Sequence, residues 1–77
     1  MYIRVRVILM EKEEIKQVIK EISASMKKKG YDPVNQIVGY LISNDLGYIP
    51  LFDKNRNKIA KIDRTLILES MLEEYLK

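Results

Sequence analysis

Apolar residues recur along most of this chain with the spacing of helices. Between Glu11 and Lys29 they follow the i, i+3, i+4, i+7 and i+11 pattern of one helical stripe, at Ile15, Val18, Ile19, Ile22 and Met26. Acidic residues stand in the first turn and lysines in the last, where each sign of charge favours the helix dipole. Gly30 can then supply the left-handed residue that commonly follows a helix. We therefore predict a helix over residues 11 to 29.

A second helix is predicted to begin at Asp32-Pro33 and to end near Ser43. The Asp32 carboxylate can accept an unpaired amide hydrogen at the N-cap, and Pro33 has no amide hydrogen to leave unpaired. Asn44-Asp45, followed by Gly47, signals the end. The predicted apolar face consists of Val34, Ile37, Val38, Leu41 and Ile42.

Gly39 stands in the middle of this second helix, where glycine costs about 1 kcal/mol relative to alanine. Such a cost indicates a packing reason for the glycine. Asn35 and Ser43 lie one turn away on either side, so the three residues form a stripe of small or short side chains. We predict that another backbone crosses the helix at Asn35, Gly39 and Ser43, as small residues permit in close helix pairs.

Residues 48 to 62 fit two structures. Because Ile49 precedes Pro50, its backbone is biased toward an extended conformation, which predicts a connector over residues 46 to 51. Residues 54 to 61 then form either a short helix capped by Asp53 or part of a hairpin with strands 48–52 and 58–62. We favour the helix, with Ile59 and Ile62 turned inward.

A last helix is predicted from Arg64 to Leu76, with Asp63 as its N-cap. Its apolar face consists of Leu66, Ile67, Met71, Leu72 and Tyr75. Leu68 and Leu76 widen this surface beyond what one neighbouring helix would cover. A surface this broad predicts an interface with a second copy of the chain, with Leu68 and Leu72 among its contact residues.

The first residues follow a different period. Ile3, Val5 and Val7 alternate with Arg4 and Arg6, which is the pattern of a strand with one buried face. A lone strand leaves its backbone unpaired, so the segment either pairs with its equivalent in a second subunit or is strand-like only in composition. We thus expect an N-terminal strand or flexible arm at 1–10 and a single helical domain at 11–77.

Composition limits what can stabilise so short a chain. A domain of this size buries only about 60% of the surface its unfolded chain exposes, and the 77 residues include neither Cys nor His for a disulfide or a zinc site. An apolar share of 47% still suffices for a core. The predicted fold is mainly α, a compact bundle of three to four short helices with a short N-terminal strand, assembled as an intertwined homodimer. No stretch approaches the roughly 20 apolar residues of a membrane span, so a cytoplasmic protein without membrane contact is expected.

Catalytic and metal-binding chemistry is not indicated. Without His or Cys, catalysis would rest on carboxylate pairs, lysines or tyrosines, and Glu73 and Glu74 diverge because they are adjacent on a helix. Residues 53 to 57 begin like a calcium loop, but Lys58 and Arg64 stand where that loop needs glycine and glutamate. We predict no enzyme, no cofactor and no metal.

Five cations define what we call the basic stripe: Lys54, Arg56, Lys58, Lys61 and Arg64. With Asn55 and Asn57 between them, these residues could contact phosphates or base edges. A helix-turn-helix reader, however, carries basic residues on its recognition helix, and the predicted second helix contains neither Lys nor Arg. A small dimeric nucleic-acid-binding protein is therefore the alternative function, and nucleic acid is the less favoured partner.

A long block of this sequence resembles a known family. Lys29-Gly30-Tyr31-Asp32-Pro33-Val34-Asn35-Gln36-Ile37-Val38-Gly39-Tyr40-Leu41, followed by Tyr48-Ile49-Pro50, is similar to the central signature of the IreB family of small bacterial regulatory phosphoproteins. Arg56-Asn57-x-Ile59 and the Leu-rich C-terminal helix also look similar. The resemblance implies a compact helical homodimer without catalytic activity. It further implies a regulatory protein partner and a role downstream of a transmembrane Ser/Thr kinase that senses the cell envelope.

One family property has no counterpart in these residues. Members of the family are phosphorylated on threonines near the N-terminus, whereas no Ser or Thr precedes Ser23 here. Thr65 is the candidate substitute, because a phosphate at the start of a helix beside Arg64 would gain from the dipole and from the guanidinium. Its alternative role is that of an ordinary first-turn helix residue.

Overall fold

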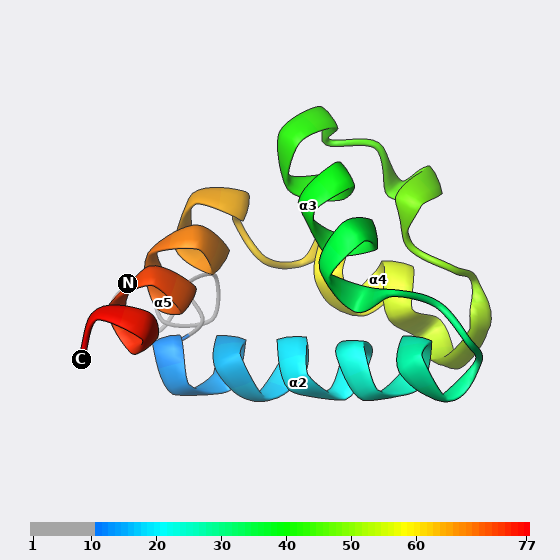
Figure 1. Ribbon diagram of the computed structural model, residues 1–77. Helices are drawn as coiled ribbons and strands as arrows, with labels where there is room; N and C mark the ends of the chain where they lie inside the picture. Colours follow the sequence, from blue (N-terminus) through cyan, green and yellow to red (C-terminus); the bar gives the residue numbers. More distant parts are fainter. Residues whose placement is uncertain (1–10) are drawn as a thin grey trace, which may run out of the picture.

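The computed structural model describes residues 11–77, so the predicted strand or arm at 1–10 lies outside the described part. Within it the chain forms α2 (Lys12–Lys28), α3 (Pro33–Ser43), α4 (Asn55–Ala60) and α5 (Arg64–Leu76), with 3₁₀ turns η1 (Leu46–Tyr48) and η2 (Phe52–Lys54) (Figure 1). The mainly α fold with four helices is confirmed. The hairpin alternative is wrong, because residues 55–60 are helical.

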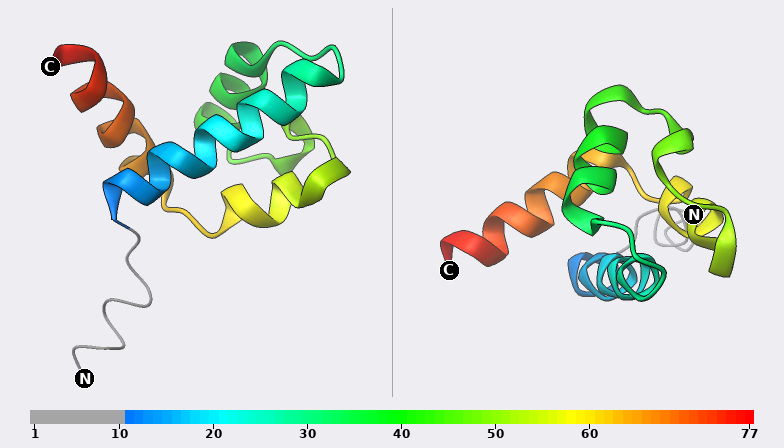
Figure 2. Two further views of the ribbon diagram at one scale, coloured as in Figure 1. Left: turned by 90° about the horizontal axis from the view of Figure 1, so that it is seen from below. Right: turned by 45° about the vertical axis from the view of Figure 1, so that its right-hand side comes forward.

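The longest helix, α2, forms one side of the molecule, and α3, α4 and α5 all lie on the other (Figures 1 and 2). Its predicted stripe is the centre of the core, with Ile15, Ile19, Ile22 and Met26 buried and Val18 partly buried. The remaining buried apolar residues come from every other helix and from the connector: Ile37, Tyr40, Ile49, Ile59, Ile62 and Ile67. One helix therefore supplies the surface that three shorter helices share.

Most of the predicted helix ends are confirmed. Gly30 has φ +88°, and the amides of Gly30 and Tyr31 donate to Lys27 O and Met26 O in the pattern of a Schellman cap. The Asp32 carboxylate accepts from Val34 N at 3.0 Å, and Asp63 accepts from Thr65 N at 2.7 Å. These local signals act without tertiary contacts, which explains why the pattern of residues alone located them.

The predicted cap at Asp53 is wrong. Asp53 and Lys54 both adopt left-handed backbone conformations, with φ 56° and 57°, so the chain makes a tight bend before α4 begins at Asn55. The Asp53 carboxylate instead accepts a hydrogen bond of 2.6 Å from the Ser25 hydroxyl of α2. Asn55 Nδ2 also donates to Ser25 Oγ, at 3.0 Å, so this bend is attached to α2 by side chains.

The predicted apolar faces of α3 and α5 are only partly buried. On α3 the buried residues are Ile37 and Tyr40, whereas Val34, Val38 and Ile42 face outward, with Ile42 80% exposed. On α5, Ile67 is buried with Leu66 and Met71 packed beside it, and the residues left exposed are Leu68, Leu72, Tyr75 and Leu76. Both helices thus carry an apolar side that no other part of residues 11–77 covers.

Candidate protein-binding site

The connector between α3 and α4 surrounds a surface hollow, which we call the aromatic hollow. Its walls include Tyr31, Gln36, Tyr48, Pro50, Phe52 and Arg56, and its volume is about 610 Å³. Tyr31 follows the end of α2, Gln36 lies on the first turns of α3, and Arg56 lies in the first turn of α4. The hollow therefore forms only where three separate parts of the chain meet. In Figure 1 the connector between α3 and α4 runs along the right-hand side.

Hydrogen bonds hold the connector that lines this hollow. Gln36 Nε2 donates to Tyr48 O at 2.7 Å, and Arg56 Nε donates to Ile49 O at 2.5 Å. The Ile49 side chain is fully buried. With Ile49 as an inward anchor in extended backbone, Tyr48 stays exposed and Pro50 half-buried at the surface.

Aromatic and cationic groups gather at the same place. The Tyr31 and Phe52 rings lie 5.8 Å apart at a tilt of 43°, and the Lys29 ammonium lies 5.4 Å above the Phe52 ring. Such arrangements are favourable because the ring faces carry negative potential. Tyr31 and Tyr48 remain 44% and 42% exposed, so their rings offer contact surface to another molecule.

The Tyr48 ring also explains the glycine in the middle of α3. A Cβ at position 39 would lie 2.5 Å from Tyr48 Cε1, a separation that no real contact of this kind shows. Within this chain an aromatic ring therefore packs on Gly39. Ser43 Oγ donates to Gly39 O at 2.7 Å, and Asn35 is exposed. A backbone crossing at Asn35, Gly39 and Ser43 stays a prediction.

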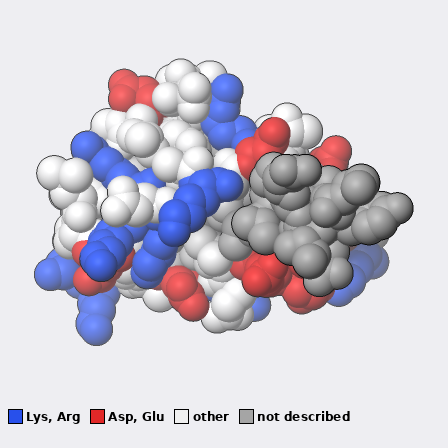
Figure 3. Space-filling model, turned by 180° about the vertical axis from the view of Figure 1, so that it is seen from behind, with Lys and Arg blue, Asp and Glu red and all other residues white. Residues whose placement is uncertain are grey.

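The basic stripe is not one continuous surface. Arg56 and Arg64 are half-buried, and each donates to a backbone carbonyl, of Ile49 and Leu41 respectively. Lys54 and Lys61 are exposed and Lys58 is half-buried, whereas Asn55 is fully buried and cannot reach a base or phosphate. On the face in Figure 3, Lys and Arg side chains are interspersed with uncharged residues and carboxylates. Nothing in this arrangement supports the nucleic-acid alternative.

Arg64 connects the start of α5 to the end of α3. Its Nη1 donates to Leu41 O at 2.8 Å, which satisfies one of the carbonyls that the last turn of a helix leaves unpaired. Arg64→Ala is expected to lower the free energy of unfolding by about 1.5–3 kcal/mol, the range for hydrogen bonds to charged groups. Urea denaturation measures the loss. The exposed cation Lys61 is the control, and equal effects of Arg64→Ala and Lys61→Ala would contradict the role given to Arg64.

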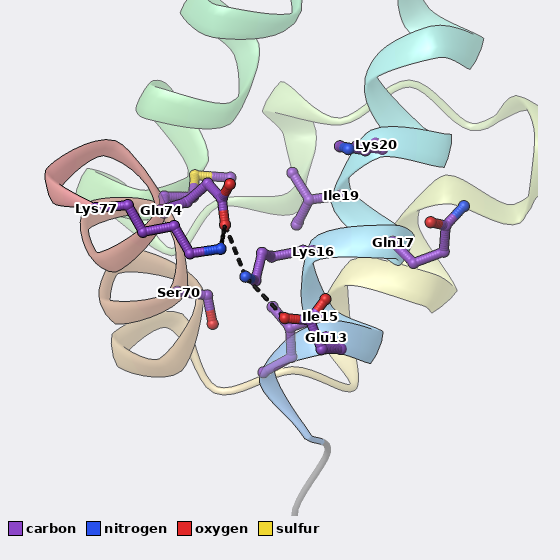
Figure 4. Close-up of a pocket in the computed structure, with 10 residues that line it drawn as sticks. Glu13, Ile15, Lys16, Gln17, Ile19, Lys20, Ser70, Glu74 and Lys77 are labelled. Carbon is purple, nitrogen blue, oxygen red and sulfur yellow. Dashed lines mark hydrogen bonds and ion pairs between the residues drawn. The ribbon is translucent and has the colours of Figure 1, made fainter.

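Lysines of α2 form ion pairs with glutamates of α5. Lys12 Nζ lies 2.8 Å from Glu73 Oε2, and Lys16 Nζ lies 2.7 Å from Glu74 Oε1, with Lys16 pointing between the two helices (Figure 4). The Lys16 hydrogen bond holds the pKa of Glu74 below its ordinary value of 4.5, and the carboxylates of Glu73 and Glu74 raise the pKa values of Lys12 and Lys16. Glu73 and Glu74 are exposed, and Lys12 and Lys16 are half-buried at the surface, so salt partly screens these interactions.

These pKa shifts predict a pH dependence with a definite sign. A carboxyl group whose pKa is lowered on folding stabilises the native state above pH 4.5, and this contribution is lost as the pH falls through the folded pKa. Lys12 and Lys16, whose pKa values are raised on folding, stabilise the native state fully below pH 10.5. This contribution is lost as the pH rises through their folded pKa values. Glu74→Gln is therefore expected to flatten the loss of stability on acidification from about pH 7 to pH 3. Melting temperatures of both proteins across this pH range measure the difference. If the melting temperatures of wild type and Glu74→Gln fall in parallel, the stabilising role given to the Glu74 carboxylate is contradicted.

The other predicted site residues lie apart from the aromatic hollow. Leu68 and Leu72 are 52% and 57% exposed on α5 and have no covering neighbour in residues 11–77. Thr65 is exposed in the first turn of α5, where its amide binds the Asp63 carboxylate. The hydroxyl of Ser70, also on α5, is buried and lacks a hydrogen-bond partner within the described residues, which no sequence pattern had indicated.

A comparison with known families gives one result for this chain. The family model described as "IreB regulatory phosphoprotein" matches residues 3–77. The chain belongs to the IreB family. Membership in a family of regulatory phosphoproteins, which is not a class of enzymes, assigns the chain a regulatory role and implies protein partners. Over residues 11–77, no helix has the length and apolar character needed to cross a membrane.

Residues of the segments that resemble the IreB family meet in the aromatic hollow. Five residues within the segments that carry the resemblance line this single surface: Tyr31, Gln36, Tyr48, Pro50 and Arg56. Sequence reasoning had assigned them separately to a turn, a helix, a connector and a basic stripe. The sequence held a signal only for Tyr48 and Pro50, since an apolar Ile49 in extended backbone can turn inward and leave its two neighbours at the surface.

Proposed function

We propose that this protein is a non-enzymatic cytoplasmic regulator, which acts as a homodimer by binding a protein partner. The observation that carries the proposal is the match of residues 3–77 to a family of regulatory phosphoproteins. In this proposal the protein acts downstream of a transmembrane Ser/Thr kinase in cell-envelope stress signalling, and the aromatic hollow is the partner-binding surface. Exposed tyrosines support that role, since Tyr is enriched at protein interfaces.

The homodimer is supported by the apolar sides of α3 and α5 that lie open in residues 11–77. Val34, Val38 and Ile42 follow one another at intervals of four residues along α3, and Leu68 and Leu72 do the same on α5. A domain this small becomes substantially more stable when a second subunit covers such apolar surfaces. Residues 1–10 can contribute by pairing between subunits, as their alternation of apolar and basic residues suggests.

Phosphorylation is the proposed switch, with Thr65 as the acceptor. The Thr65 side chain is exposed and follows Arg64, whose Nη1 donates to Leu41 O. A phosphate at this position would attract the Arg64 guanidinium and compete with that carbonyl. Incubation with a cognate Ser/Thr kinase followed by mass spectrometry tests this proposal, with Thr65→Ala as the control. Phosphate incorporation that is unchanged in Thr65→Ala would exclude this acceptor.

Two measurements test the regulatory role as a whole. Sedimentation of the full chain at micromolar concentration is expected to give twice the mass of one subunit. Affinity capture from a lysate, performed with and without nuclease, is expected to retain the same protein partner in both cases. Capture that depends on nucleic acid would instead favour the nucleic-acid alternative, and a monomer without any captured protein would refute the proposal.

A further inference from the structure

We propose that the aromatic hollow binds an extended acidic segment of a partner protein, with an aromatic or proline side chain against the exposed faces of its rings and a carboxylate on Arg56. This inference rests on the proposed function, because it names the chemistry of the partner that the regulator would recognise.

The charge of the hollow is supplied by Arg56. Its Nε is held by Ile49 O, which fixes the plane of the guanidinium and leaves the two Nη groups as donors. Among residues 11–77 no carboxylate forms an ion pair with Arg56. A guanidinium positioned in this way binds a carboxylate strongly, because two parallel hydrogen bonds can form.

Within residues 11–77, no negative charge among the walls opposes Arg56. The Lys29 ammonium lies beside the Phe52 ring, and none of the lining residues carries a carboxylate. The aspartates closest along the chain already accept hydrogen bonds: Asp32 from Val34 N, Asp45 from Gly47 N, and Asp53 from Ser25 Oγ. These carboxylates keep their negative charge, but none of them is among the lining residues, and Arg56 is the one charged residue that the described part of the chain contributes to the walls.

The walls of the hollow favour a flat, rigid apolar side chain. Tyr31, Tyr48 and Phe52 present rings, Pro50 stands among them, and Leu51 is 74% exposed at the edge. Grooves lined by aromatic residues bind extended proline-containing segments, because such segments lose little conformational entropy on binding. A volume of about 610 Å³ is large enough for two or three side chains.

The connector's hydrogen bonds argue against binding by addition of a strand. The carbonyls of Tyr48 and Ile49 already accept from Gln36 and Arg56, so they are engaged within the chain. Recognition must therefore use side chains. The Gln36 carbonyl oxygen, which is not used in its bond to Tyr48 O, is available for a peptide N–H.

Selection from a library of random 12-residue peptides, displayed on phage and applied to the full chain, tests this inference. The enriched peptides are expected to combine Asp or Glu with an adjacent aromatic residue or proline. Binding of the best synthetic peptide should weaken about tenfold in Leu51→Glu, which places a like charge at the edge, and in Arg56→Gln. Lys61→Gln removes an exposed cation outside the hollow and should leave the affinity within about twofold.

Leu51→Glu changes an exposed side chain, so its thermal unfolding should match that of the wild type even if Arg56→Gln is less stable. A library without binders, enrichment of basic peptides, or equal affinity of Leu51→Glu and wild type would each overturn the inference. The proposed function is tested separately: a lysate partner captured equally by wild type and Leu51→Glu would leave that function intact and reject the hollow as its site.

Discussion

Replacing Gly39 with leucine is expected to lower the free energy of unfolding by about 1–3 kcal/mol, as inserted bulk does in packed sites. The reason is the Tyr48 ring, which occupies the position of any side chain at residue 39. Tyr48 cannot move as a whole, because its carbonyl accepts from Gln36 and the following Ile49 is fully buried. Its ring must therefore swing into solvent and open the wall of the aromatic hollow. Urea denaturation measures the loss of stability.

A double-mutant cycle shows whether the ring is the cause. With Tyr48 present, Gly39→Ala should destabilise the protein, because even a Cβ overlaps the ring. In a Tyr48→Ala background the same change should stabilise α3 by about 1 kcal/mol, the difference in helix propensity between alanine and glycine. A Gly39→Ala effect with the same sign in both backgrounds would argue against the ring. A change of mass in solution for Gly39→Leu would indicate that the subunit contact is also affected.

Ile22→Ala is expected to lower the free energy of unfolding by about 2–5 kcal/mol. Ile22 is fully buried in the middle of α2, the helix that contacts α3, α4 and α5. Truncation there leaves a cavity that three shorter helices cannot close together. A small domain has only about 5–15 kcal/mol of total stability, so the variant should be partly unfolded near physiological temperature. Ile22→Val should lose about 0.5–1.5 kcal/mol.

Ile42 provides the matched control for Ile22. It is the same residue type in a helix, but it is 80% exposed on α3. In a monomer Ile42→Ala should change stability by no more than about 0.5 kcal/mol. If a second copy covers this side of α3, the same variant should weaken dimerisation and make the melting temperature depend more strongly on concentration. Equal losses for Ile22→Ala and Ile42→Ala at high dilution would contradict the burial described for α2.

Signals between residues close in sequence located most of the helices. The period of apolar residues located α2, and Asp32-Pro33, Asp63 and Gly30 marked helix ends within one or two residues of those observed. These signals succeed because a cap or a helical stripe depends on residues at most a few positions apart. Asp53 failed for the opposite reason, since its partner is Ser25 on another helix. A carboxylate before a helix predicts a cap only when no distant donor binds it.

The candidate site was much less accessible to such reasoning. Arg56 and Arg64 looked like part of a basic surface, because sequence shows the charge of a side chain and not the carbonyl it binds. Likewise, all five apolar residues of α3 appeared equally suited to the core, whereas Ile37 is buried, Leu41 is partly buried and the other three are exposed. Burial of one side depends on which helices are close in space, and that requires the tertiary arrangement.

By itself, therefore, the sequence determined that this chain is helical, where its helices begin and end, and that it resembles the IreB family. The tertiary structure alone decided which apolar sides stay open, why position 39 is glycine, and that Tyr31, Gln36, Tyr48, Pro50 and Arg56 share one hollow. The physical reason is the separation along the chain over which each kind of interaction acts. Helix formation and capping act over a few neighbouring residues, whereas a binding surface depends on contacts between segments up to 25 residues apart in the chain, from Tyr31 to Arg56 (56 − 31 = 25).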